Sequence, residues 1–384
     1  MHTSTMHRSA SAGLALVASA CLLASCQNPD SRPKEETSAA APESSAPHSA
    51  TSTAPAETTE TSAAESEGPR ATAEGHVVVL STGGTIASTH DKTGAVVPTV
   101  TGSKLVEPLS GTFDKDKLTL EVKDIAKLDS SAMTLDDTDT IIEAVNKELR
   151  RDDVDGVVVT HGTDSMEETA IAVDTFQDSD KPVALTGAMR PFDDPDPDGP
   201  DNLALAVKTV TDPSNKGRGT FIAFADHVIP ARGAFKSDTT KADGFANNNG
   251  KKQPQRPPAL KHQPLGNTRV DIIAAYPGAP ADLIQRSLDS GAESIVIEGM
   301  GAGNIGDELA QAAKAAAKKV PVVLTTRVDH GPVEGIYGGA GGGATLADAG
   351  VISSGTLRAP QARMLLAAAI TTGTDAEDLF AHAE

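Results

Sequence analysis

The sequence is poor in the residues that mark a disulfide scaffold or an aromatic core. Aromatic residues make up 3% of its 384 residues, and tryptophan is absent. The two cysteines, Cys21 and Cys26, both lie near the amino terminus, so the rest of the chain has neither a disulfide nor thiolate chemistry. Small aliphatic side chains must therefore fill the core.

Positive charge is also scarce, because the formal net charge is −20 at pH 7. A strongly negative chain repels phosphates, which argues against nucleic acid as a partner. The ten histidines show no paired His/Cys spacing of the zinc type. We therefore expect no metal site.

A long apolar run covers Gly13–Ser25, after a segment that carries His and Arg but no acid. This pattern predicts a secretory signal peptide over residues 1–25, too short to cross a membrane comfortably. Its end, Leu23–Cys26 (LASC), resembles a bacterial lipobox. That implies cleavage before Cys26 and a lipid anchor on its sulfur. The alternative is a soluble exported protein, cleaved near Ala24 or Ser25.

Residues 26–73 are rich in Ser, Thr, Ala, Pro and Glu, with almost no large apolar side chain. Such a segment cannot bury enough surface to offset its ordering entropy, and we expect a disordered tether. The tether would hold the folded part outside the cell, on the outer face of the cytoplasmic membrane. The membrane is contacted only through the lipid on Cys26.

From residue 76 onward, strand-like and helix-like segments alternate. The predicted strands are 77–81, 118–122, 156–160, 182–186 and 220–224, and then 270–275, 294–298 and 321–325. The predicted helices are 102–110, 135–151, 165–177 and 201–211, and then 280–290, 307–319 and 360–372. This alternation predicts an α/β fold with a mostly parallel sheet and helices on both faces.

Two domains are expected, a larger one over residues 74–256 and a smaller one over residues 269–384. The chain between them, 257–268, belongs to a polar, proline-rich stretch that begins at residue 247. We interpret that stretch as an exposed connection.

Two buried strands each end in a glycine–threonine turn. The first, 77–81, runs into TGGTIA at 82–87, and the second, 156–160, runs into HGTDSMEET at 161–169. Open α/β sheets bind ligands at the carboxyl edge of their strands. Thr85 and Thr163 could therefore meet in one crevice.

The second of these motifs continues into a predicted helix. Asp164 would lie just before the helix, where backbone N–H groups point at an anion. Ser165 and Glu168 have the spacing of a capping box.

These stretches resemble the type II L-asparaginase family, the asparaginase/glutaminase amidohydrolases. Further similar stretches are TGAMRP at 186–191 and SGTL at 354–357, and the resemblance runs over roughly residues 76 to 372. It implies the two-domain α/β architecture and hydrolysis of L-asparagine to L-aspartate and ammonia without a cofactor. It also implies a homo-oligomer, with a homotetramer as the family expectation.

The resemblance assigns the catalytic roles. Thr85 would attack the side-chain amide carbon and form an acyl-enzyme. Thr163 would orient or activate the attacking species, and Asp164 would pair with the substrate's α-ammonium group. Lys236, in the segment 231–240, would lie beside them, where a buried cation lowers the cost of a developing alkoxide.

The resemblance also implies which residues bind the substrate. Ser130 or Ser131 matches the serine that holds the substrate carboxylate, and the alignment favours Ser130. Asn304 and Glu334 match residues that reach the active site of a neighbouring subunit.

The chain departs from the resemblance most clearly in the lid. Well-known family members carry a tyrosine in the mobile lid, which corresponds here to about residues 88–103. The two tyrosines of this chain, Tyr276 and Tyr337, both lie elsewhere. Tyr337, near Glu334, is a candidate substitute. A catalytic triad through His161 is conceivable, but a histidine before Gly-Thr-Asp more often fixes its loop by hydrogen bonding.

Two other functions stay open from the sequence. One is a glutaminase-asparaginase, or an enzyme for another ω-amide, because one methylene changes pocket affinity by only about 1–3 kcal/mol. The other is a non-catalytic lipoprotein that binds a small amino acid.

Overall fold

The computed structural model describes residues 73–249 and 256–381. The predicted signal peptide, the lipidation site Cys26 and the tether fall on residues 1–72, outside the described residues. Within the described part of the chain, no helix has the length and apolar character needed to cross a membrane.

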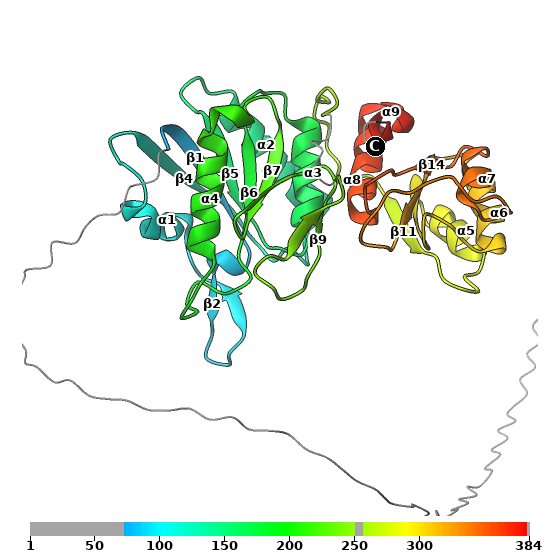
Figure 1. Cartoon of the computed structure of the whole chain (residues 1–384), viewed down its shortest axis with the longest axis horizontal. Coiled ribbons are helices and arrows are strands. Elements are labelled where there is room, and N and C mark those ends of the chain that lie inside the picture. The colour runs from blue at the N-terminus through cyan, green and yellow to red at the C-terminus, as the bar shows by residue number, and fades with distance from the viewer. Residues whose placement is uncertain (1–72, 250–255, 382–384) are drawn as a thin grey trace, which may run out of the picture. The chain divides into compact units, whose positions relative to one another are not determined.

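The larger sheet has six strands in the order β4-β1-β5-β6-β7-β8 (Figure 1). The strands are β1 (Gly75–Gly83), β4 (Leu118–Leu128), β5 (Gly156–Thr160), β6 (Val183–Thr186), β7 (Thr220–Phe224) and β8 (His227–Pro230). All neighbouring pairs are parallel except β7 and β8. The mostly parallel sheet expected from the sequence is confirmed.

Helices cover both faces of this sheet, because its central strands are apolar on both sides. The helices are α1 (Gly102–Val106), α2 (Leu135–Leu149), α3 (Met166–Phe176) and α4 (Gly199–Thr211), with the 3₁₀ turns η1 (Thr85–Ala87), η2 (Glu107–Gly111) and η3 (Pro213–Asn215). Val78 and Leu80 of β1 pack in the core that contains α2 and α3. Val77 and Val79 pack in the core that contains α4.

The second sheet is smaller and entirely parallel, in the order β11-β12-β13-β14. Its strands are β11 (Val270–Ala274), β12 (Ser294–Gly299), β13 (Val322–Thr326) and β14 (Ile352–Ser353). The helices of this part are α5 (Asp282–Asp289), α6 (Asp307–Ala316), α7 (Gly343–Ala347), α8 (Ala359–Thr372) and α9 (Ala376–Phe380). The larger and smaller α/β domains expected from the sequence are therefore present.

Helix α8 joins the two domains in one core. It is apolar nearly all round, as expected of a helix with no solvent face. Leu365 and Leu366 are fully buried and belong to the same core as Phe176 of α3 and Val296 of β12. The shared core therefore ties α8, and with it the second sheet, to α3.

The described part of the stretch 247–268 is only partly exposed, which corrects the expectation of a fully exposed connection. Leu265 is fully buried, and the backbone N–H of Leu265 donates to the Asp139 carboxylate at 2.7 Å. His262 Nε2 lies 2.8 Å from the same carboxylate. The proline-rich composition correctly predicts that residues 256–268 form neither helix nor strand. The backbone N–H groups of Leu265 and the next residue are nevertheless hydrogen-bonded, because they donate to the carboxylate of Asp139 on α2.

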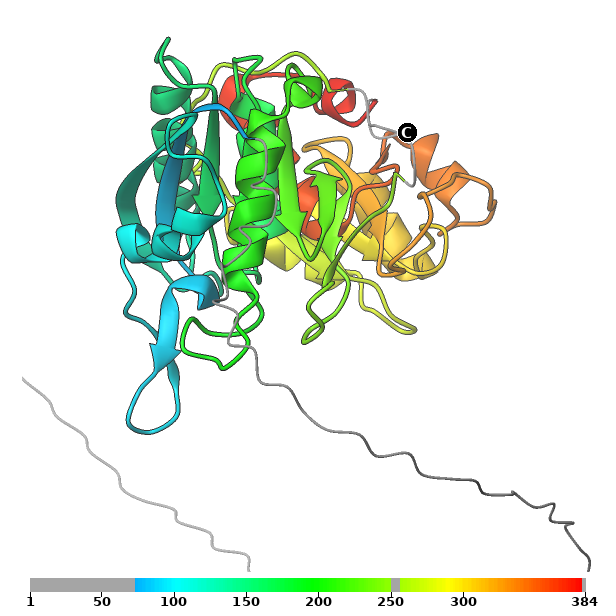
Figure 2. The ribbon, with the colours of Figure 1, turned by 60° about the vertical axis from the view of Figure 1, so that its left-hand side comes forward.

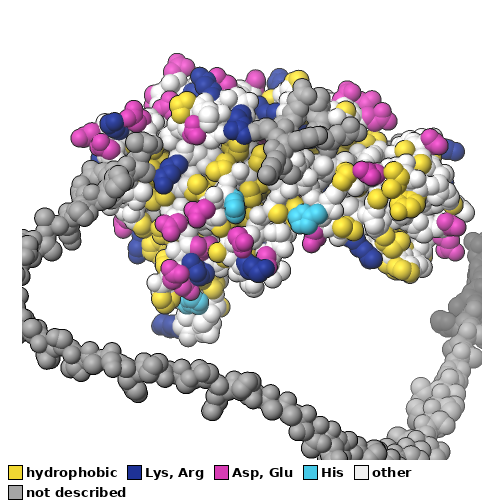
Figure 3. All heavy atoms as spheres, viewed as in Figure 1, with side chains coloured by type: hydrophobic (Ala, Val, Ile, Leu, Met, Phe, Trp, Pro, Cys, Tyr) yellow, Lys and Arg dark blue, Asp and Glu magenta, His cyan; other side chains and the backbone are white. Residues whose placement is uncertain are grey.

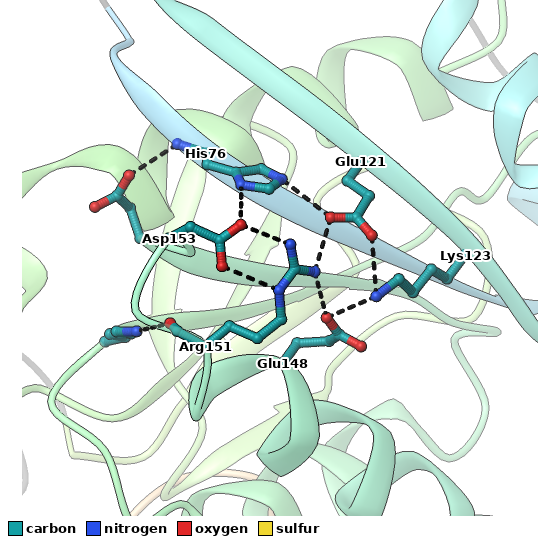
Figure 4. A network of polar contacts seen from close by, with 8 residues as sticks. His76, Glu121, Lys123, Glu148, Arg151 and Asp153 are labelled. Atoms are coloured by element: carbon teal, nitrogen blue, oxygen red, sulfur yellow. Dashed lines mark hydrogen bonds and ion pairs between the residues drawn. The ribbon is translucent and has the colours of Figure 1, made fainter.

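Figure 4 shows a charged network at the amino-terminal end of β1. Its members are His76, Glu121, Lys123, Glu148, Arg151 and Asp153. The Glu148 side chain is 3% exposed and lies 2.7 Å from Lys123 and 2.8 Å from Arg151. Burial by itself would raise the pKa of Glu148, but hydrogen bonds from these two cations outweigh it and lower the pKa below its ordinary value. The network joins β1, β4 and α2.

The segment expected to form a lid begins with an antiparallel hairpin of β2 (Ser88–His90) and β3 (Val96–Pro98). Figure 2 shows this hairpin projecting beyond the sheet. His90 Nδ1 lies 3.0 Å from an Asp193 carboxylate oxygen, and the His90 N–H donates to the same carboxylate. The hairpin is thus attached to the loop that follows β6.

Candidate active site

The order of the strands places a switch point at β1. The chain leaves β1 for β4 on one side and then crosses to β5 on the other side. In open α/β sheets the ligand crevice lies outside the carboxyl ends of the strands at such a point. Thr85 follows β1, Ser130 follows β4 and Thr163 follows β5. Three polar residues predicted from the sequence therefore come from three adjacent strand ends.

Two glycines let these strand ends touch. Gly84 has φ 79° and ψ 177°, a backbone conformation that is essentially restricted to glycine. A Cβ on Gly84 would lie 2.4 Å from the Gly162 nitrogen, and one on Gly162 would lie 2.3 Å from the Ser130 Oγ. The turns after β1, β4 and β5 are therefore in direct contact.

Lys236 ends the short strand β9 (Ala234–Lys236), which pairs with β10 (Phe245–Asn247). Its ammonium Nζ donates to the Thr163 Oγ1 at 2.9 Å and to the Asp164 Oδ1 at 2.7 Å. The lysine side chain is 21% exposed, whereas that of Asp164 is 58% exposed. The cation is thus held within the site, while the carboxylate is open to an incoming molecule.

Ser130 and Ser131 differ in their contacts. Ser130 is 8% exposed, and its hydroxyl accepts a hydrogen bond from the Asp164 N–H at 3.3 Å. Ser131 is exposed, and its hydroxyl donates to the adjacent Asp129 carboxylate at 2.9 Å. The structure thus brings Ser130, and not Ser131, into contact with the start of α3.

The capping box expected at Ser165 does not form. Ser165 occupies the N-cap position of α3, but its side chain makes no capping hydrogen bond. Its hydroxyl instead donates to the Ser130 carbonyl at 2.7 Å. The Ser165 hydroxyl thus bonds to a residue distant in sequence instead of to the first turn of its own helix. This bond links the start of α3 to the turn after β4.

Thr85 is the first residue of η1 and is partly buried. Within the described residues, its hydroxyl makes no side-chain hydrogen bond, so it is available to another molecule. The turn around it is fixed by its neighbours: the Thr82 hydroxyl donates to the Thr160 carbonyl at 2.7 Å, and the Ser88 hydroxyl to the Gly84 carbonyl at 2.8 Å.

His161 has the loop-fixing contacts expected of it. It is fully buried, with Nδ1 2.7 Å from the Gly162 carbonyl oxygen and Nε2 3.0 Å from the Thr169 Oγ1. Burial lowers its pKa to about 4, so the ring is neutral at physiological pH. Both ring nitrogens are engaged, which leaves no free base for a triad.

Asn304 and Glu334 lie in the second domain, after β12 and β13. The Glu334 N–H donates to the Ala302 carbonyl at 3.0 Å, so the two loops touch. The side-chain oxygen of Asn304 is buried and has no hydrogen-bond partner within the described residues. Within that same part of the chain, no hydrogen bond joins either residue to Thr163 or Lys236.

Sequence reasoning missed two buried polar residues near Lys236. Glu167 of α3 is 8% exposed, and Gln361 of α8 is fully buried. The Glu167 carboxylate accepts a hydrogen bond from the Lys236 backbone N–H. A signal was present for Glu167, because an acid in a helix that is mostly apolar needs a partner when it is buried. Gln361 gave no such signal.

The residue types gathered at these strand ends are ones that acyl transfer can use. A free hydroxyl, a second hydroxyl beside a cation, and a carboxylate are the parts of an activated nucleophile site. Among the described residues, no group of three or more His, Cys, Asp or Glu side chains could hold a metal ion.

Two family models match this chain. One, described as Asparaginase, N-terminal, matches residues 76–255, and another, described as Glutaminase/Asparaginase C-terminal domain, matches residues 269–381. The chain belongs to the asparaginase family. It is therefore an amidohydrolase, and a non-catalytic binding lipoprotein is not favoured.

Individual asparaginases are similar over most of their length. L-asparaginase 2 of Bacillus subtilis is 32% identical over 80% of this chain and 85% of its own. A protein of Haemophilus influenzae named probable L-asparaginase periplasmic is 32% identical over 78% of this chain and 90% of its own. The crystal structure of a probable cytoplasmic L-asparaginase from Campylobacter jejuni has a TM-score of 0.69 and 28% identity, and covers 80% of this chain and 100% of its own.

The close approach at Gly84 gives a stability prediction. Gly84→Ala places a methyl group against the Gly162 backbone in a conformation that costs about 1–3 kcal/mol for a non-glycine residue. We expect the free energy of unfolding in urea to fall by at least about 3 kcal/mol. The matched control is Gly94→Ala, because Gly94 has φ +85° but open space around it. Equal losses in the two variants would show that the backbone contact is unimportant.

Proposed function

We propose that this asparaginase-family enzyme hydrolyses L-asparagine to L-aspartate and ammonia, with Thr85 as its nucleophile. The observation that carries the proposal is the contact of the Lys236 ammonium with Thr163 and Asp164. The turn that holds these two residues touches the turn that carries Thr85. The similarity to proteins named L-asparaginase supports the substrate.

In the first half-reaction, the Thr85 Oγ attacks the side-chain amide carbon of asparagine. The amide nitrogen leaves as ammonia after taking up a proton, and an ester joins Thr85 to the aspartyl group. In the second half-reaction, water attacks that ester, aspartate leaves, and the Thr85 hydroxyl regains its proton. Thr163 orients and activates the attacking species in this scheme.

Lys236 supplies the charge that this chemistry needs. Its ammonium group lies 2.9 Å from the Thr163 Oγ1, where it stabilises negative charge that develops as a proton leaves that hydroxyl. Asp164 accepts from Lys236 through one oxygen. Its exposed carboxylate can therefore pair with the substrate's α-ammonium group. In this scheme Ser130 contacts the α-carboxylate, which is supported by its contact with the Asp164 N–H.

The nucleophile has a direct test. In purified protein given L-asparagine, Thr85→Ala should lower kcat for ammonia release by at least about 10³-fold, because the acyl-enzyme cannot form. Thr85→Ser keeps a hydroxyl and should retain measurable release. Thr119→Ala, an exposed threonine at the far end of β4, is the matched control.

The same assay run with L-glutamine decides between the two amide substrates. Comparable release from L-glutamine would replace the asparaginase assignment with a glutaminase-asparaginase. Undiminished release by Thr85→Ala would overturn the assignment of the nucleophile.

We further propose that the enzyme is a homo-oligomer, a homotetramer by family resemblance, in which the Asn304 and Glu334 loops complete the site of a neighbouring subunit. The segment after Glu334 supports this, because Ile336 and Tyr337 are 64% and 55% exposed. Figure 3 shows further hydrophobic side chains exposed over the second domain. Tyr337 lies in this segment and is the candidate substitute for the lid tyrosine.

Mixed oligomers test this arrangement. We expect Thr85→Ala and Asn304→Ala to be weakly active alone. Refolded together in equal amounts, they should regain about one quarter of the wild-type sites, because a site that combines the intact halves forms at that frequency. A mixture of Thr85→Ala with Lys236→Ala is the control, since both residues lie in the same domain and no intact combination forms. Equal activity of the two mixtures would exclude shared sites.

We also propose export and a lipid anchor on Cys26, from the sequence of residues 1–26 alone. In a bacterial host supplied with labelled palmitate, Cys26→Ser should abolish labelling and release the protein from the membrane fraction. Cys21→Ser, within the signal peptide, should leave both unchanged. Persistent labelling of Cys26→Ser would contradict the anchor.

A further inference from the structure

Three groups at the start of α3 hold Lys236. Thr163 and Asp164 bind its ammonium group, and the Glu167 carboxylate binds its backbone N–H. The side chain and the main chain of the lysine are thus fixed by one short segment. This arrangement leaves Lys236 little freedom to move away from Thr163.

A second buried side chain fixes the turn that leads into β9. The Gln361 amide donates to the Ala231 carbonyl at 2.7 Å and to the Glu167 carbonyl at 3.1 Å. Its oxygen accepts from the Gly233 N–H at 2.8 Å. A single amide from α8 therefore bridges the start of α3 and the turn before Lys236. Glu167 is held at both its main chain and its side chain.

We propose that Glu167 is a positioning residue for the hydrolytic reaction, whose ionised carboxylate holds Lys236 against Thr163 and Asp164. This inference rests on the proposed role of Lys236 above. A charged acceptor makes a stronger hydrogen bond to the Lys236 N–H than a neutral one does.

Among the described residues, two charged side chains act on Glu167. Lys236 on β9 and Glu168 on α3 are its charged neighbours. Lys236 in turn is paired with Asp164, and Glu168 lies 3.7 Å from Arg363 of α8. Burial raises the pKa of Glu167 to about 7. The carboxyl group is therefore about half ionised at neutral pH. Its hydrogen bond with the Lys236 N–H should strengthen as the pH rises through about 7.

The pH dependence of the free energy of unfolding distinguishes a positioning role of Glu167 from a purely structural one. A carboxyl group whose pKa rises on folding binds its proton more tightly in the folded state, so stability falls as pH rises from about 4.5 to about 7. Glu167→Gln, which stays neutral, should therefore be no less stable than the wild type at pH 8. Any loss of activity in that variant at pH 8 cannot then be attributed to unfolding.

Two measurements on Glu167→Gln test the proposal. The kcat of the wild type for ammonia release should rise through about pH 7, and this rise should be absent in the variant. At pH 8 the variant should have a kcat lower by about three- to tenfold with little change in KM, because a neutral acceptor replaces a charged one. In ¹⁵N-lysine-labelled protein, the Lys236 amide signal should titrate near pH 7 in the wild type and not in Glu167→Gln.

Glu168→Gln is the matched control, because Glu168 is the adjacent acid, burial raises its pKa too, and it lies against Arg363 instead of Lys236. It should keep both the kcat rise and the amide titration, shifted to a somewhat lower pH because the Glu168 charge no longer raises the pKa of Glu167. A Lys236 amide that does not titrate, or a kcat rise that survives in Glu167→Gln, would overturn the proposal. A titrating amide in a wild type that releases no ammonia would support the positioning contact and reject the proposed reaction.

Discussion

The candidate site depends on one close approach between two backbones, at Gly84 and Gly162. A side chain at either position would occupy the space of its neighbour, with a Cβ at Gly84 only 2.4 Å from the Gly162 nitrogen. Because β1 and β5 are adjacent parallel strands, their turns leave the sheet at the same edge. Removing both side chains lets those turns touch, and this contact sets the positions of Thr85 and Thr163. The specificity of the TGGT and HGTD motifs has this steric origin.

The second constraint is that buried polar groups need partners. Gln361, Glu167 and Lys236 form a continuous set of hydrogen bonds from α8 to the start of α3. The shared apolar core around α8 brings these groups together. The second domain therefore supports the lysine of the first, in addition to any contribution it makes to a neighbouring subunit. A substitution in α8 can alter catalysis in this way without contacting substrate.

The contrast between Ser130 and Ser131 shows what a pattern of residues leaves undecided. Both serines follow β4, and adjacent loop residues share no periodicity that would separate them. The structure separates them by burial, since Ser130 is 8% exposed and contacts the start of α3. Ser165 shows the same effect, because its spacing predicted a local cap and its hydroxyl found a partner on another strand end. In both cases the outcome depended on a contact between residues that lie far apart in the sequence.

The sequence by itself determined the parallel sheet, the two domains and the two strand-end turns, because runs of buried β-branched residues and glycines constrain the backbone locally. It also determined which residue types could carry the chemistry. The resemblance implied that Lys236 lies beside Thr163, 73 residues earlier in the chain, and the structure gives the contact itself. Only the tertiary structure decided that Glu167 and Gln361 hold the backbone around that lysine. Those contacts depend on how α3, β9 and α8 pack together, and the packing is fixed by side chains far apart in the chain.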